Sequence, residues 1–516
     1  MKKIMQAIQQ LTIKPQWIFG LAALAVGVMI GALVPNVSET WLILGGTVAL
    51  ILTLITLYRP DLGLLALVFI TYTRLSDILV HDYGLPSIAK LFVPLLLGIT
   101  LLRWFLFKER PSGWQRSAIL LATYGAVGLI SIFFAANAER TQDGLIAYAK
   151  DALIVIAIAL LLKRGVMLRR VIWTLLITGI FLGTISVIQQ ITGTFENAYW
   201  GFGQASVQNI VGDTSGYRIA GPIGSPNYYA LVMVVLVPLA LERLWHSQKE
   251  IERILAGWAL VVSALAVIFT FSRGGFLSLI VVLVFMFIRR PPRPMAVLVT
   301  GVLIFMLWQY APAQYVDRLS TLVAVFDDTP VEEVSLRGRT SEVTAAWLMF
   351  VDHPFIGVGF DDFKSHYQTY AQQLGLELRS EERSAHSLYL EVAAETGLMG
   401  IFAFSAILAA MFHGMQTAKK AFSEAGMSDY AGMVGAVSVG LIGYLTGSLF
   451  LHLAFPRYFW LLVGIALAIP NVAAYEIALR QQNTLARQQN EAETGANPPQ
   501  LPDNSWQHQP LAQTFR

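Results

Sequence analysis

Two apolar runs joined by a very short turn occupy residues 254–288, which read ILAGWALVVSALAVIFTFSRGGFLSLIVVLVFMFI. A helix needs about 20 mostly apolar residues to cross a bilayer. Only helices and closed barrels satisfy their backbone hydrogen bonds in lipid, and these runs are continuously apolar rather than alternating. The stretch therefore predicts two membrane-spanning helices that nearly touch at the turn 270–275, where Gly274 and Gly275 permit a close backbone turn.

The composition of the whole chain points to the same class of protein. Its 516 residues are 55% hydrophobic and only 13% charged, with a mean hydropathy of +0.59 and a net charge of +3. Soluble domains carry about 25% charged residues. These values exclude an ordinary soluble enzyme, a disordered regulator and a nucleic-acid binder. The lack of cysteine excludes disulfides, thiolate metal sites and a cysteine nucleophile.

Similar apolar runs recur along most of the chain and predict an all-α fold, a polytopic transmembrane bundle of 12–14 helices within residues 1–475. The run 62–80 is weak because it contains Arg74 and Asp77, and the run 274–288 is short. The candidate spans are 17–34, 41–58, 62–80, 88–107, 117–135, 144–162, 170–191, 227–243, 254–271, 274–288, 294–310, 388–413, 430–450 and 456–472.

The distribution of positive charge sets the expected orientation. If the N-terminus is cytoplasmic, most of the 36 Lys and Arg residues fall in inner segments, as the positive-inside rule requires. Both termini are then cytoplasmic, and the protein lies in the plasma (inner) membrane. Residues 192–226 form a polar outer loop, and 311–387 form one large extracytoplasmic loop with short helices. Residues 476–516 form a cytoplasmic tail, a short helix extension followed by disorder.

Arginines on the outer side oppose this bias and are therefore candidate site residues. Arg273 lies in the tight turn 270–275, where it presents a guanidinium at the outer face or snorkels to lipid phosphates. Arg218 opens the segment 218–227, whose glycines and prolines fix an irregular backbone that ends in Asn227. Pro226 suits the first turn of the next helix, and free amide groups at that helix start favour an anion.

His386 lies where the large loop meets the span 388–413. Histidine can take a proton from a hydroxyl near neutral pH, which makes His386 the candidate general base. Glu395 lies about two and a half turns further into the helix, too deep to orient His386 directly. Lys150 and Asp151 interrupt the span 144–162, where Lys150 adds charge to an anionic site or pairs within the bundle.

The large loop contains further polar features. Arg339 follows Gly338, and residues 345–353 predict an amphipathic helix that ends at Pro354, with His353 in a structural role. Asp361 and Asp362 are adjacent, but the chain has no Asp-x-Asp motif, so we expect no metal site. The turn Gly357-Val358-Gly359 is a weak phosphate signal on its own.

Four of these pieces occur in an order that resembles the O-antigen ligase and O-antigen polymerase superfamily. They are the segment Arg218 to Asn227, the Phe-Ser-Arg-Gly-Gly turn at 271–275, the stretch from Arg339 through Asp352-His353-Pro354 to Gly357-Val358-Gly359, and His386 followed by Glu395-x-Gly397-x-x-Gly400. The pieces cover residues 210–470. The preceding part of the chain resembles the family only in being a series of spans.

The resemblance implies a membrane glycosyltransferase that acts on the extracytoplasmic face. Its donor is a glycan on a polyprenyl (undecaprenyl) pyrophosphate carrier, and it needs no metal, cofactor or nucleotide sugar. His386, Arg273 and Arg218 are then catalytic, and Asn227, Arg339, Lys150 and Glu395 bind substrate. Acceptors in the family include lipid A–core, growing polysaccharide and proteins, so ligase and polymerase activity both remain open. A solute transporter, for example of inorganic carbon, is the alternative, and Lys150-Asp151 favours it.

Overall fold

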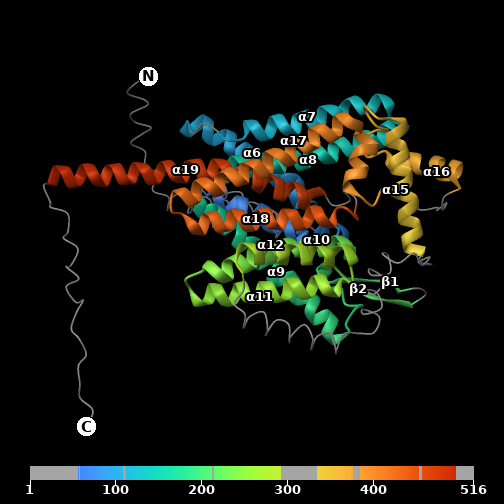
Figure 1. Cartoon of the computed structure of the whole chain (residues 1–516), viewed down its shortest axis with the longest axis horizontal. Coiled ribbons are helices and arrows are strands. Elements are labelled where there is room, and N and C mark those ends of the chain that lie inside the picture. Colours follow the sequence, from blue (N-terminus) through green and yellow to red (C-terminus); the bar gives the residue numbers. More distant parts are fainter. Residues whose placement is uncertain are drawn as a thin grey trace, which may run out of the picture.

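The computed structural model describes residues 56, 59–108, 112–211, 214–291, 334–375, 384–451 and 456–494, and these residues form a bundle of long helices (Figure 1). The helices are α4 (Pro60–Thr73), α5 (Leu75–His81), α6 (Ile88–Phe107), α7 (Gln115–Ser131), η2 (Ile132–Phe134), α8 (Ala138–Leu161), α9 (Gly165–Thr192), η3 (Tyr199–Gly201), α10 (Pro226–His246), α11 (Glu250–Phe269), α12 (Arg273–Arg289), α15 (Val334–Asp352), α16 (Phe363–Leu374), α17 (Leu388–Glu424), α18 (Ser428–Gly447) and α19 (Pro456–Thr494).

The predicted polytopic helical bundle is confirmed. Among the described residues, nine helices are long and apolar enough to cross a membrane, and the bent pair α4–α5 makes a tenth if it is one span. Eleven predicted spans coincide with one of these helices or with α12: the eight from 62–80 to 274–288, and 388–413, 430–450 and 456–472. The expected spans 17–34 and 294–310, and all of 41–58 except Thr56, lie outside the described residues.

The weak run 62–80 is bent where its charged residues occur. Arg74 adopts a left-handed conformation with φ of 59° between α4 and α5, and the two helices diverge by 56°. The Arg74 Nε atom donates to Asp77 Oδ2 at 2.9 Å, and Asp77 Oδ1 accepts from Arg457 of α19 at 2.8 Å. The break therefore brings two arginines to one carboxylate.

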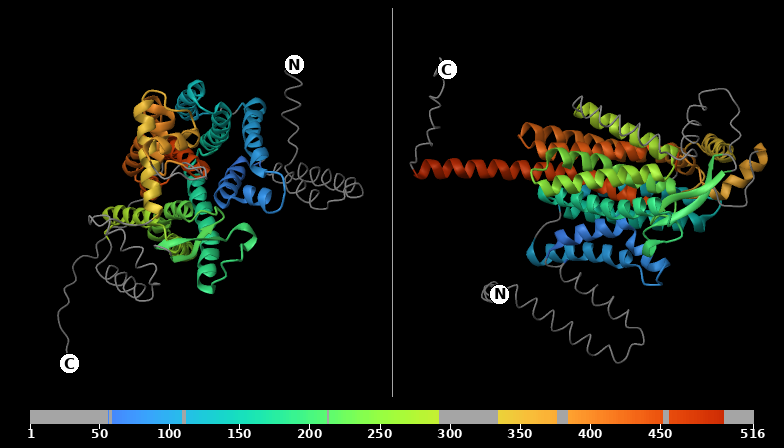
Figure 2. Two further views of the ribbon diagram at one scale, coloured as in Figure 1. Left: turned by 90° about the vertical axis from the view of Figure 1, so that its right-hand side faces the viewer. Right: turned by 90° about the horizontal axis from the view of Figure 1, so that it is seen from below.

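The bundle has two distinct ends. We call the end with α15, α16 and a β-hairpin the loop end, and the opposite end, beyond which α19 projects, the tail end (Figures 1 and 2). Residues 476–494 continue α19 as a helix, which is the expected extension of the tail, and 495–516 lie outside the described residues. In the described part of the expected large loop, α15 ends at Asp352, just before Pro354 as predicted.

The hairpin was not anticipated from the sequence. Residues 192–226, expected to be irregular, contain β1 (Gln204–Val211) and β2 (Thr214–Gly221), which pair antiparallel. A two-stranded hairpin is marginal alone in water. Here β2 packs on α10 and α9 and buries Ile219 and Ala220 completely, so the helices stabilise it.

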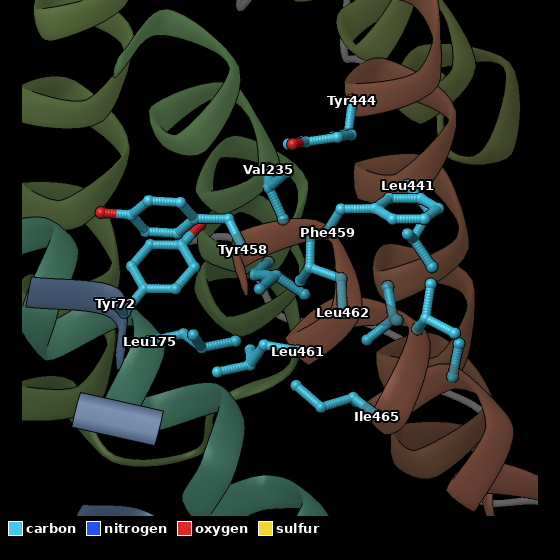
Figure 3. Packing of buried hydrophobic residues seen from close by; sticks show 14 of the residues in the cluster. Tyr72, Leu175, Val235, Leu441, Tyr444, Tyr458, Phe459, Leu461, Leu462 and Ile465 are labelled. Carbon is cyan, nitrogen blue, oxygen red and sulfur yellow. The ribbon is translucent and has the colours of Figure 1, made fainter. Parts of the chain in front are cut away.

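The helix α10 lies at the centre of the bundle, where every residue from Tyr228 to Arg243 is buried. The Tyr72 hydroxyl of α4 donates to its Val232 carbonyl at 2.7 Å, and the Tyr72 ring meets Tyr458 of α19 edge to face. Figure 3 shows this packing around Tyr72, Leu175, Val235, Leu441, Tyr444, Tyr458, Phe459, Leu461, Leu462 and Ile465.

Close helix contacts depend on glycine residues, because glycine has no side chain. At Gly183 of α9, an added Cβ atom would lie 2.7 Å from Val262 Cγ2 and 3.0 Å from the Val262 carbonyl oxygen of α11. A β-branched side chain and a backbone carbonyl cannot easily move away. By contrast, an added Cβ at Gly98 of α6 would meet nothing within 4 Å.

We therefore expect Gly183→Ala to destabilise the protein by about 1–3 kcal/mol through overpacking. The matched control Gly98→Ala should leave stability unchanged or raise it slightly, because alanine is the better helix former. Thermal unfolding of the purified proteins in detergent measures both. Equal melting temperatures for the two variants would contradict the α9–α11 packing.

Candidate active site at the loop end

Strand β2 and the start of α10 place Arg218 beside Asn227. Between them Gly224 has φ of +75°, a left-handed conformation that glycine adopts without strain, and Pro226 is the first residue of α10 as predicted. Arg218 Nη2 donates to Asn227 Oδ1 at 2.9 Å, and Nε donates to the Thr270 carbonyl at 2.8 Å. Arg218 is 3% exposed. Its guanidinium therefore joins the hairpin, α10 and the end of α11.

The turn between α11 and α12 is fixed by its own polar groups. Phe271 has a left-handed φ of 50°, and Ser272 caps α12 by accepting the Gly275 amide hydrogen at 3.2 Å. An added Cβ at Gly275 would lie 2.5 Å from Ala230 Cβ, so the glycine allows α12 to approach α10. Arg273 consequently occupies the first position of α12.

A small polar pocket lies at this turn, and we call it the arginine pocket. It is lined by Asn227, Ser272, Arg273, Gly274, Arg339, Phe450 and Leu451. These residues come from α10, the α11–α12 turn, α15 and the segment after α18. No carboxylate is present among these lining residues. The N-terminus of α12 adds the positive end of a helix dipole, so the pocket suits an anion.

The arginine pocket brings together Arg273, one of the predicted catalytic residues, and Asn227 and Arg339, two of the predicted substrate-binding residues. Arg218 does not line the pocket, but its guanidinium donates a hydrogen bond to Asn227, which does. The pocket volume of about 10 Å³ holds roughly one water molecule. A phosphate group therefore requires the side chains of Arg273 and Arg339 to move apart.

His386 lies next to the pocket in the short segment before α17. Its φ of 48° is left-handed, which is unusual for a residue other than glycine. The Leu388 amide donates to the Ser448 carbonyl at 3.0 Å, and this bond ties the segment to the end of α18, two residues before Phe450 of the pocket. The packing of α17 against α18 therefore fixes the place of the histidine.

A carboxylate that the sequence analysis did not single out accompanies the histidine. His386 Nε2 lies 3.1 Å from Glu342 Oε2, and Glu342 is 1% exposed. Glu342 follows Arg339 by three residues on α15, so the two side chains share a helix face. The three-residue spacing between Arg339 and Glu342 is the feature of the sequence that could have pointed to Glu342. In a neutral imidazole whose Nε2–H faces the carboxylate, Nδ1 carries the lone pair.

Lys150 and Glu395 lie elsewhere at the loop end, in a second and larger cavity. The Glu395 carboxylate accepts the amide hydrogens of Asp361 at 3.0 Å and Phe363 at 3.4 Å, which holds the α15–α16 connection against α17. Gly397 breaks α17 just beyond, with φ of +60°. Glu395 thus supports the loop and, as expected, makes no bond to His386.

The remaining histidines of the loop have different surroundings. His353 follows α15 and is exposed. Burial lowers the pKa of His366 on α16, although the Asp362 carboxylate 3.5 Å from its Nε2 atom opposes this effect. The Tyr370 hydroxyl donates to Asp352 at 2.7 Å, and burial with this bond raises the pKa of Tyr370. None of these side chains lines the arginine pocket.

The fold and the site define a multi-pass membrane protein with an arginine-lined pocket at one end of its bundle. Residues 258–405 match the family model described as O-antigen ligase, which confirms the resemblance to the O-antigen ligase and polymerase superfamily. No curated protein matches the chain. The matched range includes Arg273, Arg339, Glu342 and His386, whereas Arg218 and Asn227 precede it.

The role of Arg218 as a buried connector leads to a stability prediction. In Arg218→Lys a single ammonium group cannot reproduce the planar pair of bonds to Thr270 and Asn227. Losing hydrogen bonds to a charged group costs about 1.5–3 kcal/mol each. We expect a lower melting temperature in detergent for Arg218→Lys, and no change for Arg116→Lys on the exposed start of α7. An unchanged melting temperature in Arg218→Lys would contradict the connecting role.

Proposed function

We propose that this chain is a glycosyltransferase that moves a glycan from a polyprenyl pyrophosphate carrier, such as undecaprenyl pyrophosphate, to an acceptor hydroxyl on the extracytoplasmic face of the membrane. One observation carries the proposal. Arg273 and Arg339, with Asn227 held by Arg218, line one pocket beside the pair His386–Glu342. The family match supports a ligase or polymerase of this class.

The arginine pocket suits the pyrophosphate of such a donor. Guanidinium groups form paired, charge-assisted bonds to phosphate oxygens, and the free amides at the start of α12 add to them. These groups stabilise the negative charge that gathers on the leaving group in the transition state. A pyrophosphate leaves readily, so the reaction needs no strong general acid.

His386 is the proposed general base for the acceptor. Its imidazole takes the hydroxyl proton while the acceptor oxygen forms a bond to the anomeric carbon of the donor sugar. The bond from that carbon to the phosphate oxygen breaks, and its electron pair leaves with the polyprenyl pyrophosphate. Direct displacement inverts the anomeric carbon. Glu342, as a positioning residue 3.1 Å from His386 Nε2, stabilises the imidazolium that forms.

The acceptor distinguishes a ligase from a polymerase, and the proposal includes lipid A–core, a growing polysaccharide or a protein. The alternative of a solute transporter is favoured by Lys150 and Asp151, which line a large cavity between helices. The two functions differ in chemistry. A transporter leaves a labelled lipid-linked glycan intact, whereas the proposed enzyme releases the polyprenyl pyrophosphate.

Transfer of radiolabelled glycan by purified protein tests the proposal. We expect His386→Ala to reduce transfer by about 10²–10⁴-fold, the usual range of general-base catalysis, while the donor still binds. Glu342→Gln keeps a hydrogen-bond acceptor but loses the charge, and should reduce transfer about 10-fold. The control is His353→Ala at the exposed end of α15, which should transfer normally. Loss of transfer in His353→Ala alone would show that His353, rather than His386, is the general base.

The proposed orientation places the loop end outside the cell and both termini in the cytoplasm. Because the chain has no cysteine, single cysteines report on each side. A cysteine at the exposed Gln373 of α16 should react with an impermeant maleimide in intact spheroplasts. A cysteine at the exposed Gln482 of α19 should react only after permeabilisation. The reverse pattern would refute the orientation.

A further inference from the structure

A cavity of about 820 Å³ opens between the helices at the loop end, separate from the arginine pocket. Its walls come from the bent pair α4–α5, from α6, α8, α17 and α19, and from the start of α16 with the residues before it. Ligand sites usually have volumes of about 300–1,000 Å³. The cavity is therefore large enough for an organic ligand rather than a single ion.

Asp151 of α8 lines this cavity and is 2% exposed. Within the described part of the chain, its carboxylate makes no hydrogen bond and no ion pair. An unpaired carboxylate inside a helical membrane domain is costly and marks a functional position more often than a structural one. Its oxygens are acceptors directed at whatever fills the cavity.

Donors are present on the same walls. Lys90 of α6, Lys150 of α8 and Lys364 of α16 line the cavity, and none forms a hydrogen bond or ion pair with another described residue. The two lining arginines differ from them, because Arg74 and Arg457 are both engaged by Asp77. The cavity therefore offers these three lysine ammonium groups and the Asp151 carboxylate, and its lining also includes the carboxylates of Asp361, Glu391 and Glu395.

Aromatic rings complete the lining. Tyr124, Tyr148, Phe360 and Trp460 form a connected cluster, with ring centroids 5.5 Å apart for Tyr124–Tyr148 and 5.3 Å apart for Tyr148–Trp460. A simple anion would be repelled by Asp151, and a simple cation by the lysines. A sugar carries hydroxyls that both donate and accept, and apolar ring faces that stack on aromatics. The lining thus matches a carbohydrate.

His386 is connected through its neighbours to both the cavity and the arginine pocket. Ser384 lines the cavity two residues before the histidine, whereas the Glu342 partner of His386 lies one helical turn from Arg339 of the pocket. A displacement needs the attacking hydroxyl and the leaving group on opposite faces of the anomeric carbon. With the pyrophosphate in the pocket, the cavity is the larger space near His386 that is left for the acceptor.

We propose that this cavity binds the sugar residues of the acceptor glycan, with Asp151 accepting hydrogen bonds from their hydroxyl groups. The assignment rests on the proposed transferase function. It makes Asp151 a binding residue for the acceptor and the three lysines the contacts for acidic or hydroxyl groups on the same glycan.

Steady-state transfer kinetics with Asp151→Asn test the assignment. Losing a bond to a charged group should raise the KM for the acceptor about 10- to 100-fold, with the KM for the lipid-linked donor unchanged. Lys364→Gln, on a different helix of the cavity wall, should also raise the acceptor KM. The control is Asp143→Asn, an exposed carboxylate of the same helix that does not line the cavity. An unchanged acceptor KM in both cavity variants, or a raised donor KM instead, would overturn the assignment.

A binding measurement separates this assignment from the transferase proposal. Saturation-transfer NMR is performed on the His386→Ala protein with saccharides released from the lipid-linked glycan pool and from the envelope glycolipids of the same cells. We expect one of the two saccharides to bind and the Asp151→Asn substitution to weaken this binding. Binding of the lipid-linked saccharide indicates a polymerase, and binding of the glycolipid saccharide indicates a ligase. Binding of neither, with transfer activity present in the wild type, refutes the cavity assignment alone. Absence of transfer in the wild type refutes the transferase proposal instead.

Discussion

The buried guanidinium of Arg218 is the interaction on which the loop end depends. A charge with 3% exposure is stable only if its donors are satisfied, and here a backbone carbonyl of the α11–α12 turn and the Asn227 amide oxygen accept from it. These bonds fix the hairpin, the start of α10 and the turn that carries Arg273 relative to one another. The arginine pocket exists because these three segments are held together.

A second constraint acts on the segment that carries His386. The Glu395 carboxylate accepts two amide hydrogens from the α15–α16 connection, and α17 is bound to the end of α18 through Leu388. Together they hold the short segment around His386, where the histidine has a left-handed conformation, near both cavities. One cavity is rich in guanidinium groups, and the other combines carboxylate, lysine and aromatic side chains. Such an arrangement suits a reaction that joins two large substrates at one point.

Much of the architecture could be predicted because apolar runs of membrane length leave few alternatives. The helices match the expected spans closely, and the bend at Arg74 falls where charged residues weakened the signal. The hairpin at 204–221 could not be predicted, since its stability comes from packing on α9 and α10 rather than from a local pattern.

Only part of the candidate site could be predicted from the sequence. Arginines expected on the outer side oppose the positive-inside bias, which singled out Arg218 and Arg273. The position of His386 before a span and the chemistry of its imidazole singled out the histidine, and the family resemblance implied a substrate-binding role for Arg339. No pattern in the sequence indicates that Arg218 is buried next to the pocket rather than lining it, because its burial depends on how β2 packs. Glu342 was missed for the same reason: its contact with His386 joins α15 to the segment before α17, and the relative position of these two elements is set by tertiary structure. Asp151 was noted, but its unpartnered state in a cavity follows only from the surrounding helices.

The central claim is that the arginine pocket binds the pyrophosphate of a lipid-linked donor. Its most direct test is the equilibrium binding of radiolabelled undecaprenyl pyrophosphate to purified wild type, Arg273→Lys and Arg140→Lys, the last a loop-end arginine outside the pocket. We predict that Arg273→Lys binds about 10- to 100-fold more weakly, because lysine lacks the planar fork, and that Arg140→Lys binds like wild type. Equal affinity for all three proteins would contradict the account.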